Sequence, residues 1–179
     1  YPGTGDSARP NLVVQTAELN SDADAARLEL WKQAGAPDSP WLVISPPRSQ
    51  QPGGPVFSAP LSAETVGAVL DSPARREIVR RLGEGESAVW VLLESGDPSQ
   101  DEAAMRLLEA RLAYLSGVLE LPKLDEQDIR NGLVSVPDDG LKLAFSTLRI
   151  ARGDPAERAF APMLLGTEAG LARQREPVV

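Results

Sequence analysis

The chain has 179 residues and a mass of 19.1 kDa, which is enough for one ordinary domain or two small ones with a hydrophobic core. Its hydrophobic content of 42% and charged content of 25% are globular values and exclude a wholly disordered chain. It contains no histidine and no cysteine, so these residues cannot form a zinc finger, a cysteine nucleophile, a Ser-His-Asp triad or a dithiol redox centre. Carboxylate, hydroxyl, Arg and Lys chemistry remains, and the sequence predicts no cofactor, no metal site and no enzyme activity.

The charge is acidic, with 26 Asp and Glu against 18 Lys and Arg and a net charge of -8. Such a surface repels polyanions, so nucleic acid is not an expected partner. No apolar run approaches the length of a membrane span, and no span is predicted. The chain starts at Tyr1 rather than Met, so an N-terminal segment, such as a secretion signal, was removed or is simply absent from this sequence; a cysteine-free composition suits an exported protein. We therefore expect a periplasmic or cell-envelope location.

The first quarter of the chain predicts a strand, a helix and a second strand. Residues 1–10 are rich in Gly and Pro and predict a loop, whereas residues 12–19 contain adjacent Val residues and predict a strand. Residues 23–34 predict a helix that ends at Gly35. The run 41–44 is apolar throughout, which is typical of a short strand buried on both faces.

The next segment predicts a returning strand and two helices. Residues 56–58 follow a turn rich in Gln, Pro and Gly, and they predict an antiparallel strand. Ser62 predicts the N-cap of a short helix. Ser72 and Pro73 open a second helix, with Pro at its first position, and this helix stops at Gly83.

The second half again alternates strands with helices. Residues 88–93 predict the clearest strand, and the long helix that follows is opened by a capping signature at Asp97 and Gln100. A short helix within 124–132 and a strand at 143–150 come next. Residues 153–157 form a second capping box, which predicts a continuous helix toward Gly166.

This order of elements predicts an α/β fold with mainly parallel pairing and one antiparallel edge. Two stretches share the same order: a strand, a helix, a Gly, and then Pro40 or Pro177 before apolar residues. Two explanations fit this repeated order of elements: an internal duplication, or the chance similarity of two ordinary βα units. The predicted units are residues 11–85 and 86–179.

The shared order resembles the thioredoxin-like fold, in which a strand leads through a helix and a Gly to a cis Pro and then an apolar strand. The resemblance covers residues 12–83 and, more weakly, 87–179. It implies a thioredoxin-like mixed sheet flanked by helices, as a tandem or incomplete pair of units. The first unit would be the C-terminal part of the fold and the second the N-terminal part. Residues 88–95 are also similar to a strand of uncharacterised bacterial envelope proteins.

The dithiol of thioredoxins is missing from this pattern. The family carries Cys-x-x-Cys after its first strand, facing the cis proline, whereas residues 94–98 are Glu-Ser-Gly-Asp-Pro. The thiolate is the reactive species in dithiol exchange, so the predicted second unit, residues 86–179, cannot perform this reaction. We expect a redox-inactive binding or assembly module with a protein partner, as an accessory or structural subunit of a bacterial envelope complex. The alternative is a thiol-disulfide oxidoreductase whose dithiol motif lies outside these residues.

Ser39, Pro40 and Trp41 are the candidate binding residues. The resemblance implies a cis Ser39–Pro40 bond that shapes a peptide-binding edge beside the missing dithiol. The other interpretation of Pro40 is a turn proline in a Pro-rich loop.

Other candidates have simpler structural interpretations. Trp31, Trp41 and Trp90 would suit ligand stacking, but their apolar surroundings in the sequence favour core packing. Asp97 and Asp154 follow strands, where parallel sheets bind ligands, but their position before Pro favours a capping role.

A basic cluster lies on the helix predicted to open at Pro73. It consists of Arg75, Arg76, Arg80 and Arg81. It would suit a phosphate or an acidic partner, but Glu77 and Glu84 beside it favour a solvated helix face with balanced charge.

Overall fold

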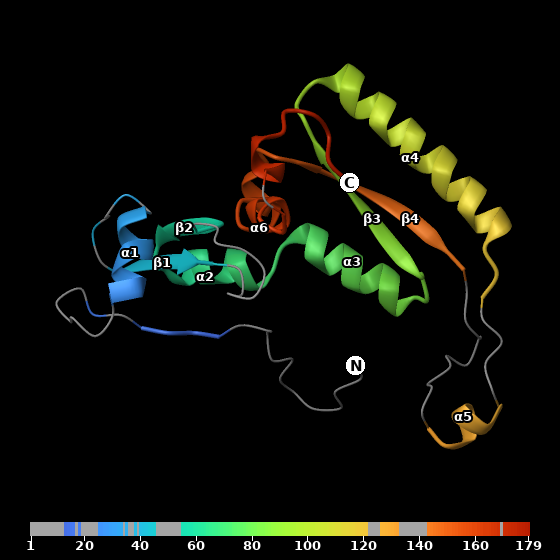
Figure 1. Cartoon of the computed structure of the whole chain (residues 1–179), viewed down its shortest axis with the longest axis horizontal. Helices are drawn as coiled ribbons and strands as arrows, with labels where there is room; N and C mark the ends of the chain where they lie inside the picture. The colour runs from blue at the N-terminus through green and yellow to red at the C-terminus, as the bar shows by residue number, and fades with distance from the viewer. Residues whose placement is uncertain are drawn as a thin grey trace. The chain divides into compact units, whose positions relative to one another are not determined.

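A computed structural model describes residues 13–16, 18, 25–33, 35, 38, 40–45, 55–121, 126–132, 143–168 and 170–179. Small sheets flanked by helices make up this part of the chain (Figure 1), which confirms the α/β class. The chain divides into two compact units, Tyr1–Leu70 and Asp71–Val179. The boundary that the sequence placed between residues 85 and 86 stays a prediction.

The first unit contains an antiparallel strand pair and two helices. Its elements are α1 (Ala25–Gln33), β1 (Trp41–Ile44), β2 (Phe57–Pro60) and α2 (Ala63–Leu70). Ile44 lies opposite Phe57, so the predicted antiparallel return is confirmed. The Thr65 amide donates to Ser62 Oγ at 3.0 Å, which confirms Ser62 as the cap of α2.

The predicted strand at residues 12–19 is wrong where the structure describes it. Residues 13–16 and 18 form neither strand nor helix, and Val13 and Val14 are each 87% exposed. β-branched residues favour a strand through packing and ladder pairing, and here no described strand pairs with them. β1 therefore pairs only with β2 among the described strands. Its four residues are half-buried rather than fully buried as the apolar run predicted.

The second unit is built on a parallel strand pair. Its elements are α3 (Pro73–Gly83), β3 (Ala88–Glu94), α4 (Pro98–Val118), α5 (Glu126–Arg130), β4 (Phe145–Ala151), the 3-10 turns η2 (Pro155–Glu157) and η3 (Leu171–Arg173), and α6 (Phe160–Leu165). β3 and β4 run parallel with Ala88 opposite Phe145. Leu93 also exchanges two backbone hydrogen bonds with Val178, of 2.7 and 3.0 Å, in an antiparallel bridge. Val178 therefore lies on the edge of β3 that faces away from β4.

Helices cover both faces of this strand pair, with α3 and α4 on opposite sides of it in Figure 1. On one face the buried cluster combines Ala74 of α3, Leu93, Ile150 and Ala161 of α6. On the other face Leu92 is fully buried, and α4 contributes the buried Met105 and Leu112. The alternation of side chains along β3 thus supplies both layers of the core.

The segment after β4 differs from the predicted continuous helix. η2 ends at Glu157, and α6 begins only at Phe160. Asp154 Oδ1 accepts the Ala156 amide at 2.9 Å, so the cap itself is confirmed. The predicted capping box would also require the Glu157 side chain to accept a backbone amide at this cap. Instead, Glu157 Oε1 accepts the Ala74 amide at the start of α3 at 2.7 Å. A carboxylate that is 3% exposed thus satisfies an amide that the first turn of a helix leaves without a partner.

We expect Glu157→Ala to lower the free energy of unfolding by about 1–3 kcal/mol, because the buried Ala74 amide would lose its acceptor. Urea unfolding of the whole chain, followed by circular dichroism, measures this change. Glu168→Ala is the matched control, since Glu168 is exposed and should shift the value by less than about 0.5 kcal/mol. Equal effects of the two substitutions would contradict the capping role of Glu157.

Candidate functional site

The three residues of the predicted binding edge are only partly described. Ser39 lies outside the described residues, so the cis Ser39–Pro40 bond stays a prediction. Pro40 is exposed, and its carbonyl accepts the Leu61 amide at 3.1 Å beside the β1–β2 pair. Trp41 is half-buried, and its indole Nε1 is buried without a hydrogen-bond partner in the described part of the chain. The role of these three residues in binding stays a prediction.

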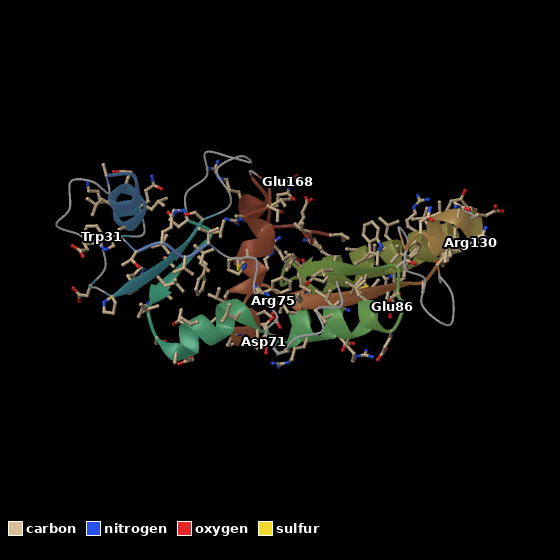
Figure 2. All side chains as sticks on the ribbon, turned by 90° about the horizontal axis from the view of Figure 1, so that it is seen from below. Trp31, Asp71, Arg75, Glu86, Arg130 and Glu168 are labelled. Carbon is tan, nitrogen blue, oxygen red and sulfur yellow. The ribbon has the colours of Figure 1, made fainter. Side chains whose placement is uncertain are left out.

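The three tryptophans differ in burial. Trp31 of α1, labelled in Figure 2, and Trp41 are half-buried. Trp90 is 39% exposed, so the core prediction is wrong for this residue. It stands on β3, and the described residues of the unit pair with the outer edge of that strand only at Leu93. An edge without a neighbouring strand leaves the indole in contact with solvent.

The loop at the carboxyl end of β3 is the best-defined polar site of the second unit. Asp97 Oδ1 accepts the amides of Ser99 and Gln100 at 2.9 and 3.3 Å, and Asp97 Oδ2 accepts Gln100 Nε2 at 3.1 Å. These bonds confirm Asp97 as the N-cap of α4. Both carboxylate oxygens of Asp97 accept hydrogen bonds from the first turn of α4, and this geometry does not support a role as a general base.

Asp101 is a site residue that the sequence analysis missed. Its side chain is 3% exposed, and its Oδ1 accepts the Ser95 amide at 2.6 Å and the Ser95 hydroxyl at 2.8 Å. Oδ2 accepts the Gly96 amide at 3.1 Å, and Gly96 has a φ of 93°, which suits glycine. Asp101 lies four positions before Met105, on the apolar stripe of α4. A carboxylate on a core-facing stripe was the signal available in the sequence.

The environment of Asp101 favours its charged form. Desolvation acts against ionisation, but the hydrogen bonds from Ser95 and Gly96 and the charge of Arg149 outweigh it and lower the pKa of Asp101. Arg149 itself pairs with Glu94 at 2.7 Å and with Glu102 at 3.0 Å.

The hydrogen bonds of this site organise the loop after β3. The Ser95 hydroxyl donates to Asp101 and accepts the Asp97 amide at 3.1 Å, so it is committed on both sides. The Asp101 carboxylate accepts hydrogen bonds from three donors of the loop. An activated nucleophile needs a neighbouring base that is free to take its proton, and the described groups of the loop do not offer one.

The basic cluster on α3 is mostly paired with carboxylates. Arg76 contacts Asp71 at 2.5 Å, and Arg80 contacts Glu77 and Glu84 at 2.7 and 2.6 Å. Hydrogen bonds from Arg80 and Arg81 lower the pKa of Glu77 to about 2. These pairs agree with the charge-balanced interpretation of the cluster.

The other two arginines of the cluster reach inward. Arg75 lies 4.6 Å from the ring centre of Phe160 and donates to Met163 Sδ at 3.2 Å, and it is labelled beside Asp71 in Figure 2. Arg81 pairs with Glu77 at 2.7 Å and donates to the Thr147 carbonyl at 2.8 Å. They therefore tie α3 to α6 and to β4.

The described residues contain no group of three His, Cys, Asp or Glu side chains arranged to hold a metal ion. Among the described helices, none combines the length and apolar character needed to span a membrane. Comparisons with protein-family models, curated proteins and solved structures found no match to the chain.

The pH dependence of stability tests the role of Asp101. Because its pKa is lower in the folded than in the unfolded chain, its carboxylate stabilises the fold above an unfolded-chain pKa of about 3.9, and this contribution is lost as the pH falls through the folded pKa. Asp101→Asn should therefore be less stable than the natural protein near pH 6, and the difference should shrink toward about pH 3.

Urea midpoints of both proteins across this range measure the difference. Glu77, whose pKa is also lowered, is present in both proteins and cancels in the comparison. A difference that stays constant with pH would contradict the stabilising role of the ionised Asp101.

Proposed function

We propose that the protein is a thioredoxin-like, redox-inactive binding or assembly module that serves a bacterial envelope complex. The observation that carries the proposal is the antiparallel bridge between Leu93 and Val178. Pro177 precedes Val178, so it lies next to the carboxyl end of β3 and the Ser95–Gly96 loop. In thioredoxins this is where the dithiol loop after the first strand faces a cis proline, which supports the resemblance for the second unit.

The hydrogen bonding of the loop and the lack of cysteine support a binding role over dithiol catalysis. The Ser95 hydroxyl and the Asp101 carboxylate are hydrogen-bonded to each other and to backbone amides, and the chain contains no cysteine. Without a thiolate, the module cannot transfer electrons by dithiol exchange, and we propose that its surfaces bind a partner. Fold alone does not give function, so the proposal depends on this loop chemistry as well as on topology.

The finer fold assignment is a proposal of the same kind. We propose a tandem or incomplete pair of thioredoxin-like units, and its support lies mainly in the second unit. The first unit contributes the antiparallel pair β1–β2 and the helices around it. It supports the resemblance less, because residues 13–16 and 18 do not form the expected parallel strand.

Affinity purification of the tagged natural gene product from its host, after mild cross-linking, tests the binding role. A partner should co-purify in fixed stoichiometry from the envelope fraction, and the purified protein should not reduce insulin disulfides. Insulin reduction without any stable partner would overturn the proposal. It would favour the alternative, a thiol-disulfide oxidoreductase whose dithiol lies outside these residues.

The geometry of the loop after β3 can be tested by introducing a pair of cysteines at its start. Asp97 and Gln100 stand at the cap and third position of α4, and their side chains touch at 3.1 Å. We expect Asp97→Cys/Gln100→Cys to form a disulfide on air oxidation, because its Cys-x-x-Cys spacing at a helix start brings the two sulfurs together and lowers the thiol pKa.

Counting free thiols before and after reduction measures this disulfide. Asp97→Ser/Gln100→Ser is the matched control, since Ser retains a capping side chain. Two thiols that stay free after oxidation would contradict the thioredoxin-like placement of this loop.

A further inference from the structure

The helix α4 has a second stripe of uncharged residues on the face opposite its buried one. The buried stripe contains Met105 and Leu112. On the opposite face, uncharged residues follow one another at spacings of four and three positions, which keeps them in one line along a helix. Leu107 and Tyr114 in this line are 60% and 63% exposed. The exposed outer stripe consists of Ala103, Leu107, Ala110, Tyr114 and Gly117.

Large and small side chains alternate along this outer stripe. Leu107 and Tyr114 are large, whereas the residues between and beside them are Ala or Gly. When two copies of such a helix pair antiparallel, each large position faces a small position of the other copy, so the side chains interdigitate. In a parallel pair each residue faces its own copy, so crowded Leu and Tyr layers would alternate with empty Ala and Gly layers. The sizes therefore favour an antiparallel pair.

One antiparallel register uses the whole length of α4. Its two-fold axis passes between Leu108 and Glu109, at the middle of Pro98–Val118. In this register Leu107 faces Ala110 of the second copy, and Tyr114 faces Ala103 of the second copy. The two-fold axis repeats both contacts, so four layers each combine one large and one small side chain.

The charges beside the outer stripe favour the same direction. Arg106 and Arg111 are exposed on its two flanks. In a parallel pair Arg106 would face Arg111 of the second copy twice, and both contacts would repel. In the antiparallel register Arg111 faces Ala104 of the second copy instead. Arg106 then lies on the flank that carries Glu109 of the second copy, so opposite charges meet there.

Gly117 also suits the close approach of a second helix. Glycine inside a helix is less favourable than alanine by about 1 kcal/mol. The fold of one chain does not require glycine here, because the φ of Gly117 is not positive and a Cβ at this position would meet no atom within 4 Å. Small residues on a helix surface allow a second helix to pack closely, and such packing would account for Gly117.

We propose that the outer face of α4 binds a second copy of this chain, with the two α4 helices antiparallel about an axis between Leu108 and Glu109. The occupant is a second copy because α4 itself supplies the complement of its own stripe, both in side-chain size and in charge. The pairing therefore needs only residues that the structure describes. This inference goes beyond the proposed function and does not depend on it.

Sedimentation equilibrium of the full natural gene product tests the proposal. We expect twice the mass of one chain at about 100 μM and dissociation on dilution. Leu107→Lys/Tyr114→Lys should raise the dissociation constant at least about tenfold, because each ammonium would face an Ala of the second copy without a partner. A single-chain mass at every concentration, or a dimer that this variant does not weaken, would overturn the proposal.

The matched control is Val79→Lys/Leu82→Lys, which changes two exposed apolar residues of α3. It should leave the dissociation constant unchanged, and circular dichroism should show the same helix content in all three proteins. If the control weakens the dimer as much as Leu107→Lys/Tyr114→Lys does, the assignment of the interface to α4 is wrong.

Cross-linking tests the direction of the helices. Ala103→Cys and Tyr114→Cys are made in separate chains, mixed and oxidised. The antiparallel register predicts mainly disulfides between positions 103 and 114, whereas a parallel pair would join position 103 to its own copy. Tryptic peptides distinguish the two products, because Arg106 and Arg111 separate these positions. A majority of 103–103 disulfides, or no disulfide, would overturn the antiparallel arrangement.

The two proposals fail separately. If the chain is a monomer but a different protein co-purifies in fixed stoichiometry, the binding function stands and the assignment of α4 is wrong. If the chain dimerises through α4 and no other protein co-purifies, the dimer stands and the role in an envelope complex is wrong.

Discussion

The hydrogen-bonded ladder between β3 and β4 is the constraint on which the second unit depends. A parallel pair of strands exposes two apolar faces, and both must be covered before the ladder is stable in water. α3 and α6 cover one face through Ala74 and Ala161, and α4 covers the other above Leu92. The polar features of the unit are arranged around the ends of this ladder.

Two buried carboxylates have related tasks at these ends. Asp101 accepts the amides that follow β3, and Glu157 accepts the first amide of α3 from the turn after β4. Each replaces water at backbone groups that the fold removes from solvent. Both side chains therefore hold backbone amides in place at buried positions of the unit.

Local signals in the sequence predicted local structure well. Asp97 before Pro98 fixed the start of α4, and the turn before Phe57 gave the antiparallel return, because capping and hairpin formation involve neighbouring residues. Long-range partners were not predictable in this way. Glu157 bonds to an amide 83 positions away, and the exposure of Trp90 depends on which strand lies beside β3. Residues 12–19 had strand propensity, but propensity does not supply a pairing partner.

The two outer edges of the β3–β4 pair differ in chemistry. Arg81 donates to the Thr147 carbonyl, and because the Ala144 carbonyl faces β3, that of Thr147 faces the opposite edge. An incoming strand on the β4 side would have to displace a charged guanidinium from this carbonyl. The guanidinium of Arg81 at the Thr147 carbonyl therefore disfavours growth of the sheet past β4.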